Sequence, residues 1–532
     1  MDKPLPLLPL FRPWMPEWLV KVVLFSVLLP GLVLFFLPLA NTNAAAGYYG
    51  SEPADIQFAV ALFYSGYAGF YALERRFFQY LATKEYFIVI TLLQLAVAYG
   101  CYQTQDLYVL FPLRFVQGIL FASAVNLSLA FMFTRLRSER AREISFSVFF
   151  GMLICALPFN NLVTADLIDS FNFNAVYKGV IFSYVPGLLA LLVSMNNIRL
   201  DVHFPLRRLD WQSFALYSIV LVLLGYIAIY GQEYYWLADL RIRRSVLAIL
   251  GLGGLYVLRQ RSLKRPYTAL AIFRIRNYKI GLLLLFILYL CRFAGGITNG
   301  FFATVLRLDP MHVSYLNLLN LAGLVVGVVV AAALTLQQVR IRFIWLAGFG
   351  LLLGFHVVMF FLFDTQANED TFYGPLFVQG LGIGLVMVPT IVFAIASVPV
   401  ALGPSAAGIC LAVRYMGYCA SVALLNFFEL LEKGRHYSAF QDVLTRTNPV
   451  VRHTLDAQAG RLLAHGLAPD RSGKAAAKLL VAAVNGQSQI RYAMDYYELM
   501  AWLLVGTLLL VGLLPYLNRT VVYLKSSRLV PA

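Results

Sequence analysis

The amino-acid sequence predicts an all-α membrane protein that crosses a bilayer many times. Of its 532 residues, 60% are hydrophobic and 13% are charged, and the mean hydropathy is +0.74. Soluble globular domains carry roughly 25% charged residues, about twice this share. Long apolar runs recur along most of the chain, and each must be helical because lipid offers backbone groups no hydrogen-bond partners outside the helix.

Fourteen runs are long enough to span the hydrocarbon core. They cover residues 18–40, 53–73, 85–102, 108–134, 144–168, 174–195, 211–230, 242–258, 278–305, 313–336, 341–363, 373–398, 404–428 and 497–518. The first run is longer than the apolar part of a signal peptide, which has roughly 7–15 residues, and we interpret it as a spanning helix.

The distribution of basic residues predicts the orientation. Lysine and arginine are concentrated in the loops that follow the second, fourth, sixth, eighth and tenth runs, as expected of cytoplasmic loops. Both termini are therefore expected in the cytoplasm. Arg241, Arg243 and Arg244, after the seventh run, break this pattern. The net charge of +16 is explained by this topology signal, and we expect no nucleic-acid partner.

One connection is long. Residues 429–496 lie between the last two runs, on the side predicted to be outside, and carry apolar residues at helical spacing. Pro449 and the region from Gly466 to Pro469 should divide this outer loop into helical pieces.

A short sequence occurs twice. Leu113 to Gly118 (LRFVQG) lies in the fourth run, and Phe377 to Gly380 (FVQG) lies in the twelfth. Repeats in two hydrophobic halves are typical of transporters. Arg114, Gln117 and Gly118 share one helical face, and Gln379 is the counterpart of Gln117. Arg114 should face either a cavity that binds substrate or the carbonyl groups of neighbouring helices, because an arginine in lipid is costly.

Further polar groups are candidates for a substrate or coupling cavity. Arg292, with Tyr289 one turn earlier, and Arg414 are embedded in the ninth and thirteenth runs. Asn160 and Asn161 follow Pro158, which should interrupt the fifth run. The alternatives are a structural arginine at 414 and a simple turn at the asparagines.

A charged group ends the second run. Glu74, Arg75 and Arg76 form either a cytoplasmic anchor or the ion pairs of an inner gate. The five cysteines show no metal-binding spacing, and no catalytic motif is present, so we expect no metal site, no cofactor other than protons as a coupling ion, and no enzyme activity.

The chain resembles the fourteen-helix drug:proton antiporter branch of the major facilitator superfamily, of the EmrB type. The resemblance covers essentially the whole chain, and its motifs lie in six places. These are Arg114-Phe-Val-Gln-Gly, Val185-Pro186-Gly187, Leu209-Asp210, the sequence LAIFRIRNY at 270–278, Phe377–Pro389 and Arg414.

The resemblance implies a fold and a function. The major facilitator fold would place one six-helix bundle in residues 1–200, two inserted helices in 201–265 and a second bundle in 266–532. The implied function is proton-coupled export of an amphiphilic small molecule or drug across a bacterial inner membrane. The outer loop would be either a lid that lies on its own helices and the lipid surface or, as the resemblance suggests for a Gram-negative host, a binding site for a periplasmic adaptor protein that leads to an outer-membrane channel.

The first run lacks the aspartate that this branch carries, and no run has an acid near its middle. Two alternatives therefore stay open: a transport-inactive scaffold or sensor, and an exporter of a specific metabolite without proton antiport.

Overall fold

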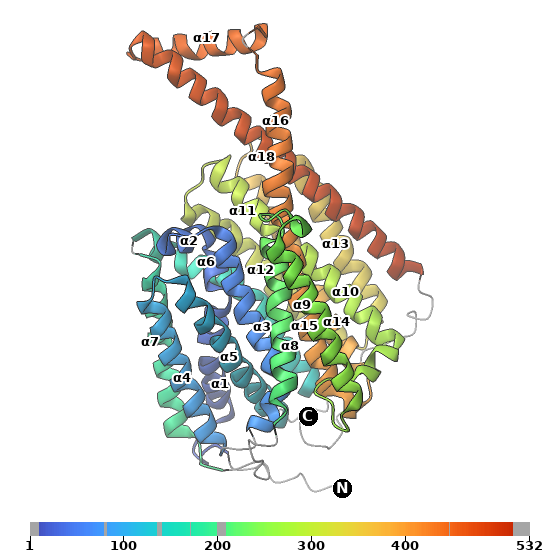
Figure 1. Ribbon diagram of the computed structural model, residues 1–532. Helices are drawn as coiled ribbons and strands as arrows, with labels where there is room; N and C mark the ends of the chain where they lie inside the picture. Colours follow the sequence, from blue (N-terminus) through green and yellow to red (C-terminus); the bar gives the residue numbers. More distant parts are fainter. Residues whose placement is uncertain are drawn as a thin grey trace.

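The computed structural model describes residues 10–78, 82–135, 141–170, 172–198, 209–445 and 447–513 (Figure 1). These residues form helices, with one isolated bridge between Phe11 and Met195 and no strand among them. Thirteen helices in the described part of the chain are long and apolar enough to cross a membrane. The protein is therefore a polytopic all-α membrane protein, as its sequence predicts.

The first bundle contains six long helices and one short one. They are α1 (Glu17–Ala40), α2 (Thr42–Tyr49), α3 (Pro53–Phe78), α4 (Thr83–Gln103), α5 (Leu107–Arg135), α6 (Ala141–Ser170) and α7 (Asn174–Ser194). Helix α1 packs against α3, α5, α6 and α7, so it runs through the interior of the bundle.

The second bundle is built from the C-terminal half of the chain. Its helices are α10 (Arg276–Arg292), α11 (Gly295–Thr304), α12 (Pro310–Leu336), α13 (Ile341–Leu362), α14 (Asp370–Ala396), α15 (Gly403–Phe427) and α18 (Pro469–Leu513). The run expected at 278–305 is divided, because α10 ends at Arg292 and α11 begins at Gly295.

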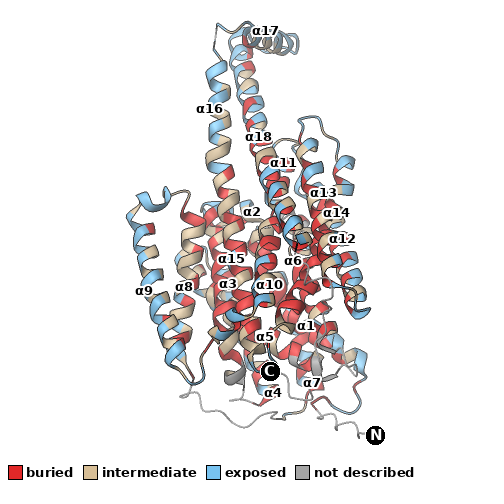
Figure 2. Cartoon of the chain, turned by 90° about the vertical axis from the view of Figure 1, so that its right-hand side faces the viewer, coloured by how far each residue is buried: buried red, intermediate tan, exposed pale blue. Residues whose placement is uncertain are grey.

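Two helices lie between the bundles in sequence, α8 (Trp211–Tyr230) and α9 (Leu240–Ser262). Helix α8 packs against α3 and α15, whereas α9 lies outside it and is largely exposed (Figure 2). The eighth expected run, 242–258, falls in α9, which is not among the thirteen apolar helices because arginines occupy both of its ends.

The 429–496 segment is divided into helical pieces at Pro449 and near Pro469, as the sequence predicts, but its first and last pieces are continuous with spanning helices. Helix α15 continues through a π-helical turn (Phe428–Glu432) into α16 (Lys433–Val443), and α18 continues without a break from Pro469 into the bundle. Helix α17 (Pro449–Ala464) joins them, so the segment is a helical hairpin that projects from one face (Figure 1). Pro449 and Pro469 begin helices, but no proline lies inside α18 to stop it. We call this face the hairpin face, and the face where α1 begins the opposite face.

The sequence predicts that Pro158 interrupts the fifth run, and this prediction is wrong. Helix α6 continues through Pro158 for 30 residues. A proline removes one backbone hydrogen bond from a helix, but the helix can continue where another group satisfies the freed carbonyl. In this protein the freed carbonyl belongs to Ile154, and its partner is described below.

The repeated sequence packs in the same way in both bundles. A Cβ atom on Gly118 of α5 would lie 1.9 Å from the Phe63 oxygen of α3, and one on Gly380 of α14 would lie 2.1 Å from the Asn320 oxygen of α12. Each glycine thus brings two backbones into direct contact, as small residues do at helix interfaces in membranes. The equivalent packing of α5 on α3 and of α14 on α12 supports an internal structural repeat.

Candidate functional site

Arg114 lies in the interior of the first bundle and is fully buried. Its Nη1 atom donates to the Leu34 carbonyl of α1 (2.9 Å) and to Gln117 Oε1 (2.8 Å), and its Nη2 atom donates to the Phe35 carbonyl (3.1 Å). Pro38 has no N–H group and leaves the Leu34 carbonyl without a helical donor. Arg114 therefore supplies the hydrogen bond that the proline removes from α1.

Gln117 and Gly118 lie near Arg114 on α5 and make contacts inside the first bundle. Gln117 accepts from Arg114, and its Nε2 atom lies 3.5 Å from Cys101 Sγ of α4. Gly118 is the contact point with α3 described above. In the second bundle, Gln379 Oε1 accepts from Asn320 Nδ2 (2.9 Å), which also donates to the Leu376 carbonyl.

The two asparagines of α6 have different surroundings. Asn160 is buried and donates from Nδ2 to the Val33 carbonyl of α1 (2.8 Å). Asn161 is only partly buried, and the Oδ1 atoms of both asparagines have no hydrogen-bond partner in the described structure. Asn160 thus links α6 to α1 inside the first bundle.

Arg292, Arg414 and Tyr289 form a second group, at the interface between the two bundles. Tyr289 and Arg292 come from α10 and Arg414 comes from α15. The Tyr289 hydroxyl accepts from Arg414 Nε (2.9 Å) and, at 3.4 Å, from Arg292 Nη1. The structure thus brings these three sequence-predicted residues together; we call them the interface cluster.

Both arginines of the interface cluster reach across to α6 of the first bundle. Arg292 Nη2 donates to the Ile154 carbonyl (3.3 Å), which Pro158 leaves without a helical donor. The Arg414 guanidinium lies 5.1 Å from the centre of the Phe150 ring, within the range of a cation–π interaction. Contacts across this interface must change if the two bundles move relative to each other.

Arg414 retains an unused hydrogen-bond donor. The residue is 2% exposed, and its Nη2 atom has no hydrogen-bond partner among the described residues. Neither Arg292 nor Arg414 forms an ion pair with any carboxylate that the structure describes. An uncompensated buried charge costs several kcal/mol, roughly, so this group is suited to an anionic ligand.

A cavity of about 20 Å³ lies beside Arg414, with room for about one water molecule. Both bundles line it: Tyr67, Tyr71, Leu129, Phe146, Phe149 and Phe150 from the first, and Ile391, Ile395, Ala407, Cys410, Leu411 and Arg414 from the second. Most of this lining is aromatic or aliphatic, which suits an apolar ligand body next to the guanidinium. A solute larger than water would require the bundles to separate.

Hydrogen bonds close the interface toward the hairpin face. Tyr418 of α15 donates to the Gln57 carbonyl of α3 (3.1 Å), and Asn426 Nδ2 donates to Gln57 Oε1 (3.1 Å) and to the Ile229 carbonyl of α8 (3.2 Å). Toward the opposite face, the Tyr267 hydroxyl donates to the Gly69 carbonyl of α3. These contacts join the elements on either side of the interface toward both faces.

The predicted inner gate is only partly described. Glu74 is buried and accepts a hydrogen bond from the Tyr86 hydroxyl (3.1 Å). The side chains of Arg75 and Arg76 lie outside the described residues, so the gate remains a prediction.

Glu233 and Asp210, both outside the spanning segments, have shifted pKa values. Burial and the neighbouring carboxylates Glu52 and Asp55 raise the pKa of Glu233, in the α8–α9 turn, to about 7. At the start of α8, burial raises the pKa of Asp210, but hydrogen bonds from Ser213 and Arg259 outweigh this effect and hold the pKa below its usual value. Arg259 Nη2 lies 2.8 Å from Asp210 Oδ1 and ties α9 to α8.

Sequence reasoning missed the aromatic surroundings of the interface cluster and the acidic cluster at Glu233. Tyr64, Tyr67 and Tyr71 recur at helical spacing on α3, and Phe146 and Phe150 do so on α6. This spacing could have predicted an aromatic face on each of the two helices. Proximity of Glu233 to Glu52 and Asp55 was not, because these residues are distant in sequence.

Comparison with known proteins identifies the fold. No family model matches the chain, and no curated protein sequence matches it. Among solved structures, the chain is similar to a POT family transporter in complex with a thioalcohol-conjugated peptide (TM-score 0.59, 12% identity, covering 95% of this chain and 98% of that one). It is also similar to the peptide transporter POT (0.56, 13%, 94% and 96%) and to the nucleoside transporter NupG (0.51, 10%, 92% and 99%). The protein has the major facilitator fold of these secondary transporters.

Proposed function

We propose that this protein is a secondary active transporter and that its substrate is an amphiphilic small molecule with a negative charge. The observation that carries this proposal is the buried, unpaired Nη2 atom of Arg414 at a cavity lined by both bundles. A substrate carboxylate or phosphate would accept a charge-assisted hydrogen bond there. The aromatic lining would contact the apolar part of the substrate.

Transport would proceed by alternating access. In this mechanism two bundles rock about a substrate site near the middle of the membrane. The hydrogen bonds between α15 and α3 would close the hairpin side, and their rupture would open it. The similarity to the POT and NupG structures supports transport in general; one is a peptide transporter and the other a nucleoside transporter, so their substrates belong to different chemical classes.

The direction, coupling and partners extend the same proposal. Following the resemblance to drug:proton antiporters, the protein would export its substrate from the cytoplasm across a bacterial inner membrane, with protons as coupling ion and both termini in the cytoplasm. The α16–α18 hairpin would then lie outside and bind a periplasmic adaptor protein that leads to an outer-membrane channel.

A flux assay tests the function directly. The purified protein is reconstituted into liposomes, and flux is measured for an amphiphilic carboxylic acid, its amide and the corresponding amine, with and without an imposed pH gradient. We expect flux of the acid above that of protein-free liposomes and little flux of the amine. Equal flux of all three compounds would contradict selection by charge. Binding without flux would favour a transport-inactive sensor.

A further inference from the structure

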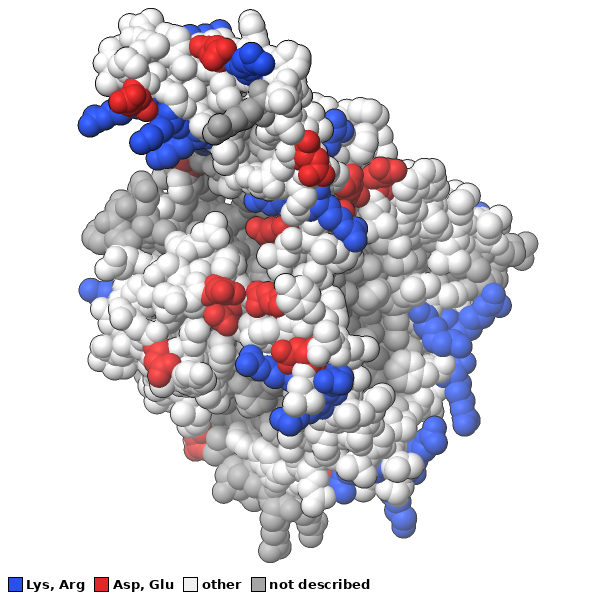
Figure 3. All heavy atoms as spheres, turned by 45° about the horizontal axis from the view of Figure 1, so that its top comes forward, with Lys and Arg blue, Asp and Glu red and all other residues white. Residues whose placement is uncertain are grey.

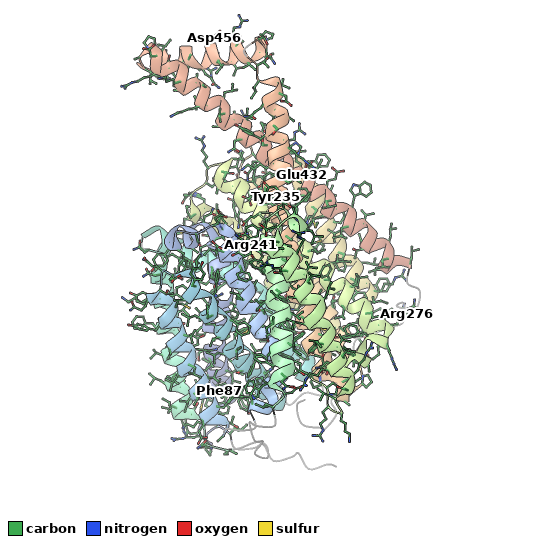
Figure 4. All side chains as sticks on the ribbon, viewed as in Figure 1. Phe87, Tyr235, Arg241, Arg276, Glu432 and Asp456 are labelled. Carbon is green, nitrogen blue, oxygen red and sulfur yellow. The ribbon has the colours of Figure 1, made fainter. Side chains whose placement is uncertain are left out.

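A cluster of three metal-binding side chains lies at the root of the hairpin. Glu432 ends the π-helical turn after α15, His436 lies in α16 and Asp495 lies in α18. Their ligand atoms, one from each residue, all lie within 4.8 Å of one another. Figure 4 shows Glu432 where the hairpin leaves the bundle, far from Asp456 in α17 at its tip. Glu432 lies several helical turns beyond Arg414 on the continuous helix of α15 and its π-helical turn, so the cluster is separate from the interface cluster.

The local helix geometry brings these groups together. Glu432 and His436 are four residues apart, which places them on one face of a helix. The π-helical turn adds a residue to one turn and so sets which face of α16 is directed at α18. Asp495 Oδ2 lies 2.6 Å from His436 Nε2, so the two helices already meet at this point.

From this geometry we infer that Glu432, His436 and Asp495 bind one divalent transition-metal ion of the zinc class. Zinc binds histidine nitrogen and carboxylate oxygen at about 2.0–2.2 Å in a tetrahedral arrangement, so two of its ligand atoms lie about 3.4 Å apart. His436 Nε2 and Asp495 Oδ2 lie 2.6 Å apart and no two of the three ligand atoms are more than 4.8 Å apart, so side-chain shifts of about 1 Å would bring them to this spacing. The imidazole favours zinc, nickel or cobalt over calcium and magnesium, which prefer oxygen ligands alone.

Charge supports a cation at this point. Two carboxylates from different helices converge on one imidazole, and a divalent ion would remove the repulsion between them. Arg435 Nη1 already contacts Glu432 Oε1 (2.7 Å), but a carboxylate has a second oxygen with which to bind a metal. Acidic and basic side chains lie around the base of the hairpin in Figure 3, so the surrounding surface does not exclude a cation.

A bound ion would fix the hairpin relative to the bundle. Helix α16 is continuous with α15, which carries Arg414, and α18 packs on α13 and α11. A metal bridge between α16 and α18 would therefore link the helix of the interface cluster to the rest of the second bundle on the hairpin face.

Metal titration tests the proposal. The full-length protein, purified without a histidine tag and stripped of metal, is titrated with Zn²⁺, and Co²⁺ is used for its visible absorption spectrum. We expect one tight equivalent that millimolar Mg²⁺ does not displace. Loss of a residue that only supports a metal ligand typically weakens metal binding by about 10–100-fold. His436→Ala and Asp495→Asn each remove a ligand and should weaken Zn²⁺ binding by at least this factor. Glu432→Gln should also weaken Zn²⁺ binding.

A matched control separates this cluster from background binding. His453→Ala removes an exposed histidine of α17 that is outside the cluster, and it should leave the tight equivalent unchanged. Thermal unfolding of each variant checks that it is folded. Zn²⁺ binding that survives His436→Ala would overturn the proposal. The absence of saturable binding in the wild type would also overturn it and leave a simple His436–Asp495 contact between the helices.

Discussion

Arg114 and Arg414 are both buried arginines in the membrane region, but their surroundings differ. Arg114 lies inside one bundle, where two carbonyls of α1 and the Gln117 side chain accept its hydrogen bonds. Arg414 lies between two bundles, where a tyrosine and an aromatic ring contact it and one of its nitrogen atoms has no partner in the described structure. Arg114 also has one nitrogen, Nε, without a partner in the described structure, but of the two arginines only Arg414 lines the cavity between the bundles. Arg114 is therefore the structural arginine, and Arg414 offers its donor to a ligand.

Arg292 combines features of both. Like Arg114, it donates to a carbonyl that a proline has freed, but the carbonyl belongs to the other bundle. Its two hydrogen bonds, at 3.3 and 3.4 Å, are longer than those of Arg114. A contact of this kind can hold one state of the interface and be released when the bundles separate. Variants that disrupt the contacts inside a bundle and variants that disrupt the contacts between the bundles should therefore have different effects.

The largest effect is expected from locking the interface on the hairpin face. Gln57→Cys and Asn426→Cys, in a background without the five native cysteines, would be joined by a short, reducible thiol cross-linker, since their side chains now lie within 3.1 Å. Flux in liposomes should be lost completely and should return on reduction. Each single-cysteine variant is the control. Undiminished flux in the cross-linked protein would exclude movement at this contact.

A large loss of stability is expected when Arg114 is removed. Arg114→Ala leaves the Leu34 carbonyl buried without a donor, and loss of one partner from a buried charged contact costs roughly 3–5 kcal/mol. Pro38→Ala restores the N–H group that the Leu34 carbonyl lacks, so the double variant should recover part of the stability. Thermal unfolding of the four proteins in this cycle measures the coupling. Additive effects would show that Arg114 does not act through the proline-freed carbonyl.

The repeated glycines should give moderate and similar effects. Gly118→Ala and Gly380→Ala each force a methyl group against a backbone oxygen, and overpacking typically costs about 1–3 kcal/mol. Gly350→Ala in α13, where a Cβ atom would meet nothing within 4 Å, is the matched control and should not destabilise the protein. Thermal unfolding measures all three. A loss in only one of the two repeat positions would argue against their structural equivalence.

The smallest effect should come from Glu233. Its pKa is raised to about 7, so the stability that protonated Glu233 contributes is full below the unfolded-state pKa of about 4.3 and is lost as the pH rises through about 7. The thermal stability of the wild type should therefore fall slightly more between pH 6 and pH 8 than that of Glu233→Gln. An identical pH dependence in the two proteins would show that Glu233 does not titrate in this window.

The sequence predicted the fold well because lipid restricts spanning segments to long apolar helices. It also identified Tyr289, Arg292 and Arg414 individually, since charged or polar groups in such helices are conspicuous. It did not predict that α6 continues through Pro158, because this depends on Arg292 from the other bundle. Nor did apolar spacing show that α18 is one helix from Pro469 to Leu513, since helical periodicity does not reveal whether separate segments join.

The most direct test of the account is a comparison of substrate affinity in Arg114 and Arg414 variants. Binding of an amphiphilic acid and its amide is measured by equilibrium titration to the wild type, Arg414→Ala and Arg114→Ala, using only folded protein. Loss of a buried charged partner costs about 2–5 kcal/mol, which corresponds to roughly 30- to 4,000-fold in affinity. We expect that Arg414→Ala removes the preference for the acid by a factor in this range, while Arg114→Ala retains it. A preference that survives Arg414→Ala, or that disappears in folded Arg114→Ala, would contradict the account.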